Sequence, residues 1–412
     1  MTSRARSIAV VVSILCLVAT ASPASAGKGQ VNLAIEWNQV MLTSFATANV
    51  PAPASSRLAA IVATATFDAV NGVQRGYTPI HVEAAAPADA SPKAAAASAA
   101  HDALVALFPT QRAALDAALA SSLARIGGEE DASVEDGVAW GARVAAEVVA
   151  WRAADGFASA PPPYVFQSDP GQWQPTPGGS GAPRFRTLAT TTPFALVSAS
   201  QFRPLGPPPL DSARFITDLA EVRSLGRQDS ATRTAWQTET ARFWQLDTPP
   251  AYWDRVADTL AISSHLNLLK TARVLALLNI ALADASFAVF DAKNHYNSWR
   301  PVTAIAADDP SWQPLMTTPY FQEYPSAHSG ISSAGVTILA STFGPDVSFT
   351  VSSGGLPGVE RSFTSLDAAL GQVGDARVWA GFHFRFSCDD GAALGRQVGA
   401  YVASHVMRPA GD

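Results

Sequence analysis

The sequence contains 412 residues, of which 48% are hydrophobic and 15% are charged, and its mean hydropathy is +0.11. These fractions exclude a disordered chain, and the length suffices for one large domain or two smaller ones. A net charge of −6 argues against a nucleic-acid or anionic-membrane partner, and the presence of only 2 cysteines excludes a disulfide-stabilised scaffold.

Residues 1–26 have the three parts of a secretory signal peptide. Arg4 and Arg6 supply positive charge, residues 8–19 are apolar, and small residues up to Ala26 form a cleavage site. The apolar run is short for a membrane-spanning helix of about 20 residues, and we expect no membrane span in the mature chain. The protein is therefore predicted to be secreted, to the medium or the cell envelope, after cleavage near Ala26.

Residues 27–209 are predicted to form an N-terminal helical region that ends in a long irregular loop. Apolar residues recur at helical spacing and alanine is abundant, which favours helices. Proline and glycine break this pattern throughout 156–209. Aromatic residues in that loop indicate that it packs over the protein, and we expect it to shape the entrance to a site. The expected helices cover 32–48, 55–74, 93–108, 111–125 and 134–154.

Residues 210–412 are predicted to form a second helical region, which carries all the candidate catalytic residues. Strand signals are sparse, and the best candidate covers 347–351. The fold class is therefore predicted to be all-α. The expected helices cover 211–224, 230–244, 254–268, 271–293, 329–342 and 391–405.

The first candidate cluster contains Lys293 and Arg300. Lys293 falls near the end of a long apolar helix, and Pro301 follows Arg300 in a turn. A lysine and an arginine that converge in this way can bind a tetrahedral oxyanion, one as a point charge and the other as a planar fork. Two cations at this spacing are, however, more often solvated surface charges.

The second cluster surrounds Ser326 and His328 at the predicted start of a helix. Pro325 and Ser326 are typical of a helix N-terminus, where unpaired N–H groups favour an anion. His328 then lies in the first turn, although a single histidine there is more often structural. The third cluster places Arg377 and His383 in an aromatic, apolar segment, and a buried arginine requires an anionic partner.

In chain order these clusters read K-x6-R-P, P-S-x-H and R-x5-H. The combination resembles the vanadium-dependent haloperoxidases and the related type-2 phosphatidic acid phosphatase superfamily. The form E-Y-P-S-A-H-S, which begins at Glu323, is most similar to the bacterial haloperoxidase-like branch. The resemblance implies a large helical bundle domain of the haloperoxidase and acid phosphatase type. The N-terminal half resembles this family only in being helical.

The resemblance also implies roles for individual residues around vanadate or phosphate. Lys293, Arg300 and Arg377 would form a positive cage around the anion. Ser326 would donate a hydrogen bond to an equatorial oxygen, and the backbone N–H of Ala327 would contribute where the family often has glycine.

Two histidines complete the implied site. His383 would be the covalent partner, as the ligand of vanadium or the nucleophile that attacks phosphorus. His328 would be the acid–base residue on the opposite side, and Lys293 would polarise hydrogen peroxide.

Two departures from the family pattern lie close to the third cluster. Ala376 replaces a usual serine, and Ser387 replaces a usual aspartate that orients the imidazole of His383. Asp389 or Asp390 could supply the missing carboxylate. These departures bear on the level of activity more than on the anion site itself.

Three functions remain open at this point. The favoured one is a vanadate-dependent haloperoxidase that oxidises a halide with hydrogen peroxide. The alternative is a secreted acid phosphatase that forms a phospho-histidine on phosphate esters, and the third is a catalytically silent anion-binding protein. Phe290, Trp299 and His295 are candidates for influencing halide preference, and the resemblance allows a homo-oligomer.

Overall fold

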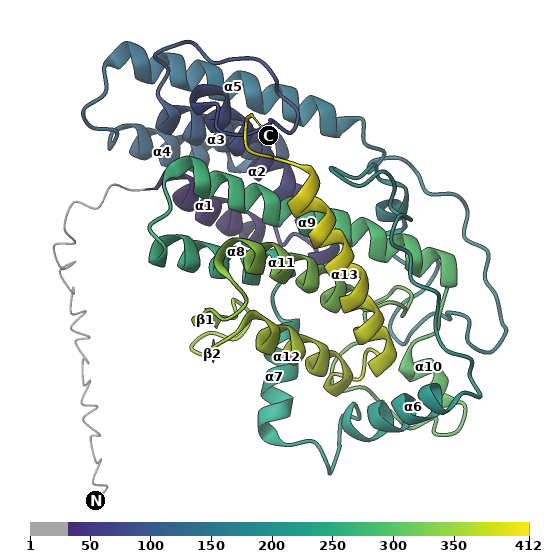
Figure 1. Cartoon of the computed structure of the whole chain (residues 1–412). Coiled ribbons are helices and arrows are strands. Elements are labelled where there is room, and N and C mark those ends of the chain that lie inside the picture. The colour runs from purple at the N-terminus through teal and green to yellow at the C-terminus, as the bar shows by residue number, and fades with distance from the viewer. Residues whose placement is uncertain (1–31, 412) are drawn as a thin grey trace, which may run out of the picture. The chain divides into compact units, whose positions relative to one another are not determined.

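The structure is a computed structural model that describes residues 32–411, and from Asn32 onward the chain forms one compact unit. Within that range the chain is mostly helical, which confirms the predicted all-α class (Figure 1). The predicted signal peptide lies outside the described residues, so secretion stays a prediction, as do the division at residue 209 and a homo-oligomer.

The N-terminal helices are α1 (Leu33–Thr47), α2 (Ala52–Gln74), α3 (Pro92–Leu107), α4 (Arg112–Leu123) and α5 (Asp131–Ala153). Two short 3₁₀ turns are η1 (Pro109–Gln111) and η2 (Arg186–Thr190). Further along are α6 (Ala213–Leu225), α7 (Ala235–Gln245), α8 (Pro249–Ser263), α9 (Leu268–Tyr296) and α10 (Pro301–Ala306). The C-terminal elements are α11 (Ala327–Phe343), β1 (Phe349–Ser352), β2 (Glu360–Phe363), α12 (Leu366–Trp379) and α13 (Arg385–His405).

Small residues bring the N-terminal helices close together. Ser91 caps α3 by accepting a hydrogen bond from the N–H of Ala94, and Pro92 occupies its first turn. At Gly141 of α5, a Cβ atom would lie 2.5 Å from the carbonyl oxygen of Ala95 in α3. Only glycine permits this approach, and α2 completes the layer by packing on both α3 and α5.

Helix α9 is the central element and carries Lys293 in its last turn. It packs against α2, α11, α8 and α13 (Figure 1). By length and composition α9 could cross a membrane, which the sequence analysis did not anticipate, but 94% of its most apolar window is buried inside the fold. Such burial is typical of a core helix.

The loop that follows α5 is irregular except for η2, as predicted. It is held to the core by the buried carboxylate of Asp284 in α9. That carboxylate accepts hydrogen bonds from the backbone N–H groups of Phe194, Ala195 and Leu196 at 2.7–2.9 Å. The loop is therefore anchored to the helix that carries Lys293.

The sequence-based boundaries differ from the structure in the C-terminal region. Helix α12 was not expected, because Gly371 and Gly374 lower its intrinsic helix propensity. The helix is stabilised instead by packing on α7 and α11, and by Ser365, which caps it by accepting from the N–H of Ala368. Helix α10 and strand β2 were also not expected, and α13 begins six residues before the predicted position.

Candidate active site: a buried cationic cage

The structure brings the three sequence clusters together at the ends of four helices. Lys293 lies in the last turn of α9, Arg300 immediately precedes α10, and Ser326 caps α11. Arg377 lies in the last turn of α12, and His383 lies in the short turn between α12 and α13. All five side chains are almost fully buried.

The ammonium group of Lys293 faces two backbone carbonyls. Its Nζ donates to the carbonyl oxygens of Gln322 and Glu323 at 2.9 and 2.7 Å. Burial, and then the nearby positive charge of Arg300, lower the pKa of Lys293 well below its usual range. Because two of the three donors are used, one N–H remains for a ligand.

The two arginines have free donors that point into the buried space. Arg300 donates from Nε to the carbonyl of Phe321 at 2.8 Å and from Nη1 to that of Phe382 at 3.0 Å. Its Nη2 has no partner, and the same holds for Nε of Arg377, whose Nη1 donates to Gln245. Burial lowers the pKa of Arg300 to about 9 and that of Arg377 to about 10. Both guanidinium groups remain charged at neutral pH and lack sufficient acceptors, which is the environment that an anion would satisfy.

The N-terminus of α11 adds backbone donors to the same site. The side chain of Ser326 accepts from the N–H and the hydroxyl of Ser329 at 3.5 and 3.2 Å. The N–H groups of Ala327 and His328 come earlier in the first turn, where no carbonyl of the helix itself can accept them. A helix N-terminus and three cations therefore favour the same negative charge.

The imidazole of His383 is held by hydrogen bonds on both nitrogens. Its Nδ1 lies 2.7 Å from Oε1 of Glu323, so Nδ1 carries the proton and donates it to the carboxylate. Its Nε2 lies 3.1 Å from Nη1 of Arg300, which donates to it. Nε2 is therefore the unprotonated nitrogen and faces the cage, where it can bind a metal or attack phosphorus.

Glu323 is the functional residue that the sequence analysis missed. Its Oε1 also accepts the N–H of Phe384 at 3.2 Å, so one carboxylate holds the ring of His383 and the adjacent backbone. Burial raises the pKa of Glu323 to about 7, against the opposing influence of Lys293 and Arg300. The only available signal was the position of Glu323 at the start of the E-Y-P-S-A-H-S motif.

The suggestion that Asp389 or Asp390 replaces the missing aspartate is wrong. Asp390 accepts a hydrogen bond from the hydroxyl of Tyr324 at 2.8 Å and pairs with Arg214 at 3.2 Å, whereas Asp389 is exposed. Both carboxylates are therefore committed elsewhere. The Ser387 hydroxyl lies 3.4 Å from Nδ1 of His383, a weaker contact than that of Glu323.

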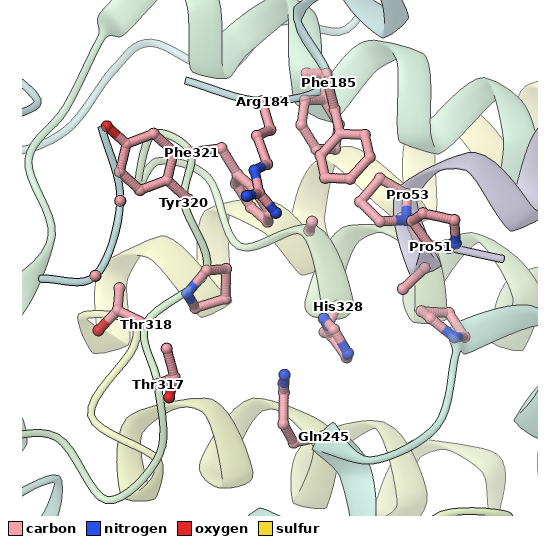
Figure 2. Close-up of a pocket in the computed structure, with 18 of the residues that line it drawn as sticks. Pro51, Pro53, Arg184, Phe185, Gln245, Thr317, Thr318, Tyr320, Phe321 and His328 are labelled. Carbon is pink, nitrogen blue, oxygen red and sulfur yellow. The ribbon is translucent and has the colours of Figure 1, made fainter. Parts of the chain in front are cut away.

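His328 lies in the first turn of α11 and lines a cavity of about 410 Å³. Its Nε2 has no hydrogen-bond partner, and Figure 2 shows the ring pointing toward Gln245. Burial, and then the positive charges of Arg377, Lys293 and Arg300, lower the pKa of His328 well below its usual range. The imidazole is therefore neutral at neutral pH and available as a proton acceptor.

The long loop contributes to this cavity, as the sequence analysis expected. Pro177, Gly178, Gly179, Arg184 and Phe185 all line it, together with residues from the start of α2 and from the segment 317–321. Among the candidates for influencing halide preference, only Phe290 is a lining residue. Trp299 packs in a separate apolar cluster and His295 is exposed, so the cavity excludes both.

The residues present fit a tetrahedral oxyanion such as vanadate or phosphate. Three buried cations and unpaired N–H groups converge on one space, while the carboxylate of Glu323 is engaged by His383. Among residues 32–411, no group of three His, Cys, Asp or Glu side chains could hold a metal cation directly. Fold and site together define a helical protein with a buried cationic cage that fits an oxyanion.

Comparisons with known proteins agree with this class. Residues 273–412 match the family model of the VCPO second helical-bundle domain. The vanadium chloroperoxidase of Curvularia inaequalis is 27% identical over 155 residues, which cover 30% of this chain and 25% of that protein. The match thus spans only about a quarter of the length of this curated relative.

Two solved structures extend the similarity to nearly the whole chain. A bacterial vanadium-dependent iodoperoxidase superposes with a TM-score of 0.79 and 27% identity, covering 90% of this chain and 96% of the other. A holo-type bacterial vanadium-dependent chloroperoxidase gives a TM-score of 0.69 at 17% identity, covering 86% and 91%, which is evidence for the fold alone. Residues 273–412 therefore match the family of the VCPO second helical-bundle domain, and the chain as a whole is similar in fold to bacterial vanadium-dependent haloperoxidases.

Proposed function

We propose that this protein is a vanadate-dependent haloperoxidase that oxidises a halide with hydrogen peroxide at vanadate bound to His383. The observation that carries the proposal is the buried cage, where Lys293, Arg300 and Arg377 surround the unprotonated Nε2 of His383. When bound, vanadate would activate hydrogen peroxide as a Lewis acid, and the vanadium would keep its oxidation state.

The residues of the chain would divide the remaining work. The free N–H groups of Arg300 and Arg377 would neutralise the oxyanion, and the donors of Ser326 and Ala327 would orient it. His328 is neutral and faces the cavity, so it would accept the proton that hydrogen peroxide releases. The third N–H of Lys293 would polarise the oxygen of hydrogen peroxide that the halide attacks.

The same residues could act on a phosphate ester, because phosphate and vanadate share shape and charge. The unprotonated Nε2 of His383 would then attack phosphorus, and His328 would protonate the leaving oxygen. The cage does not distinguish the two reactions, so an experiment must.

A paired assay separates the possible activities. The purified protein is loaded with orthovanadate and given hydrogen peroxide and bromide, and bromination of a dye is followed. The vanadate-free protein is given an aryl phosphate in parallel. We expect bromination that requires added vanadate and is absent when vanadate is omitted.

Two results would contradict the proposal. Release of phosphate that vanadate inhibits, without bromination, would assign the protein as a phosphatase. Tight vanadate binding without either activity would assign it as a silent anion-binding protein.

Glu323 is predicted to be a positioning residue for His383. Glu323→Gln keeps an oxygen acceptor but removes the charge that selects the Nδ1–H form of the ring. We expect vanadate affinity to fall about 10-fold to 100-fold, as for other residues that orient a metal ligand. Phosphate, which binds without a bond to Nε2, should bind equally well or more tightly, because a negative charge has been removed. Equilibrium dialysis of both anions measures this ratio.

Ser387→Ala is the matched control, because Ser387 touches the same nitrogen at 3.4 Å. It should change vanadate affinity much less than Glu323→Gln does. If both anions lose affinity by the same factor in Glu323→Gln, the residue serves the general structure of the site and not the orientation of His383.

A further inference from the structure

The cavity in front of His328 is much larger than the proposed small substrates require. Its volume is about 410 Å³, whereas a water molecule, which is close in size to peroxide, occupies about 30 Å³. Cavities of about 300–1,000 Å³ are typical of sites for organic molecules. We call this cavity the vestibule, defined by Arg184, Phe185, Gln245, Phe290, Phe321 and His328.

Three aromatic rings form a continuous wall of the vestibule. Phe290 and Phe321 have ring centroids 5.3 Å apart, and Phe185 lies 6.2 and 6.1 Å from them. Phe185 comes from the long loop, Phe290 from α9 and Phe321 from the segment before α11. Such a wall favours a flat aromatic guest, which can pack on it with offset or edge-to-face geometry.

Arg184 places a positive charge on the rim of this wall. Arg184 lines the vestibule together with Phe185 and Phe321, and Figure 2 shows its side chain extending toward the cavity. No carboxylate among the described residues forms an ion pair with Arg184, and no Asp or Glu lines the vestibule within that part of the chain. The rim is therefore complementary to a carboxylate or phenolate, which an arginine fork binds well.

The vestibule is preformed by contacts between the loop and Tyr320. The backbone N–H of Arg184 donates to the carbonyl of Tyr320 at 3.0 Å, and the hydroxyl of Tyr320 donates to the carbonyl of Gly181 at 2.9 Å. At Gly179 a Cβ atom would lie 1.8 Å from the ring of Tyr320, so only glycine fits there. A preformed site loses little entropy on binding.

The wall also separates the rim from the cage. The ring centroid of Phe321 lies 5.4 Å from Nζ of Lys293 and 4.9 Å from Cζ of Arg300, while His328 lines the vestibule itself. A guest held by Arg184 and the aromatic wall would therefore lie beside the acid–base histidine.

We propose that the vestibule binds an aromatic carboxylate or phenolate as the acceptor of the oxidised halogen. The anionic group pairs with Arg184, and the ring packs on Phe185 and Phe321, both of which contact the fully buried ring of Phe290. The acceptor role rests on the proposed haloperoxidase function, whereas binding does not. In the transfer, a ring carbon bonds to the halogen while the oxygen–halogen bond of hypohalous acid breaks. The ring proton and the released hydroxide leave as water.

The binding test uses 2-naphthoate and its neutral amide, titrated into vanadate-free protein by calorimetry. We expect 2-naphthoate to bind more tightly than the amide, and Arg184→Gln to weaken 2-naphthoate about 10-fold without changing the amide. Arg186→Gln is the matched control, because Arg186 is two residues away, contacts Tyr164 and does not line the vestibule. It should leave both affinities unchanged.

A second titration tests whether 2-naphthoate binds in the cationic cage instead of the vestibule. The titration is repeated after saturation with inorganic phosphate, and 2-naphthoate should still bind. Loss of binding under phosphate, or equal affinity of 2-naphthoate for wild type and Arg184→Gln, would overturn the proposal.

A bromination assay distinguishes a failure of the acceptor role from a failure of the haloperoxidase function on which it rests. With vanadate, peroxide and bromide, wild type should brominate 2-naphthoate in preference to the amide, and Arg184→Gln should lose that preference while keeping its rate on the amide. Binding without any bromination would support the vestibule and contradict the haloperoxidase function. Bromination without preference would support the haloperoxidase function and contradict the acceptor role.

Discussion

His383→Ala is expected to abolish bromination and to weaken vanadate binding by more than about 100-fold. The variant removes the Nε2 atom that faces the cage and that we propose as the covalent partner of vanadate. Such a loss should exceed the effect of altering a residue that merely orients a ligand. Equilibrium dialysis of vanadate and the dye assay measure the two quantities.

Phosphate binding provides the control for an intact cage in His383→Ala. Lys293, Arg300 and Arg377 remain, so phosphate should raise the melting temperature of the variant and of the wild type alike. His405→Ala, which removes an exposed histidine at the end of α13, should change neither activity nor affinity. Vanadate affinity within a few-fold of wild type in His383→Ala would reject His383 as the ligand.

His328→Ala is expected to lower kcat for bromination by about 10²-fold to 10⁴-fold, the usual contribution of a general acid–base group. Vanadate affinity should change only a few-fold, because the unpaired Nε2 of His328 faces the cavity that Gln245 also lines. The comparison of kcat with the dissociation constant of vanadate therefore separates proton transfer from cofactor binding.

The matched control for His328→Ala is His295→Ala, at the exposed end of α9. It should retain full kcat, because His295 does not line the cavity. A His328→Ala variant whose vanadate affinity falls in step with its kcat would contradict the acid–base role and would indicate that His328 helps to hold the anion.

Much of the fold could be predicted because its signals are local. The apolar spacing in α2 and the alanine-rich composition of α3 predict helices whatever surrounds them. Helix α12 could not be predicted in the same way, because its two glycines disfavour a helix and packing on α7 and α11 adds most of the stability that the Ser365 cap alone does not supply. The long apolar α9 is similarly ambiguous by composition, and only its burial distinguishes a core helix from a membrane span.

The same distinction between local signals and tertiary packing applies to the candidate site. The sequence by itself determined which chemical groups are available and their order, because the spacing of Lys293, Arg300, His328, Arg377 and His383 is visible along the chain. It also placed Ser326 at a helix start, since capping depends on adjacent residues.

Only the tertiary structure decided which carboxylate orients His383 and what lies in front of His328. Glu323 is 60 residues from His383 in the sequence, whereas Ser387, Asp389 and Asp390 are nearby in the chain but do not replace it. Likewise, Arg184 reaches the vestibule through a loop whose path depends on Tyr320. Such long-range hydrogen bonds depend on how the helices pack, and this packing is a property of the whole chain that no local pattern encodes.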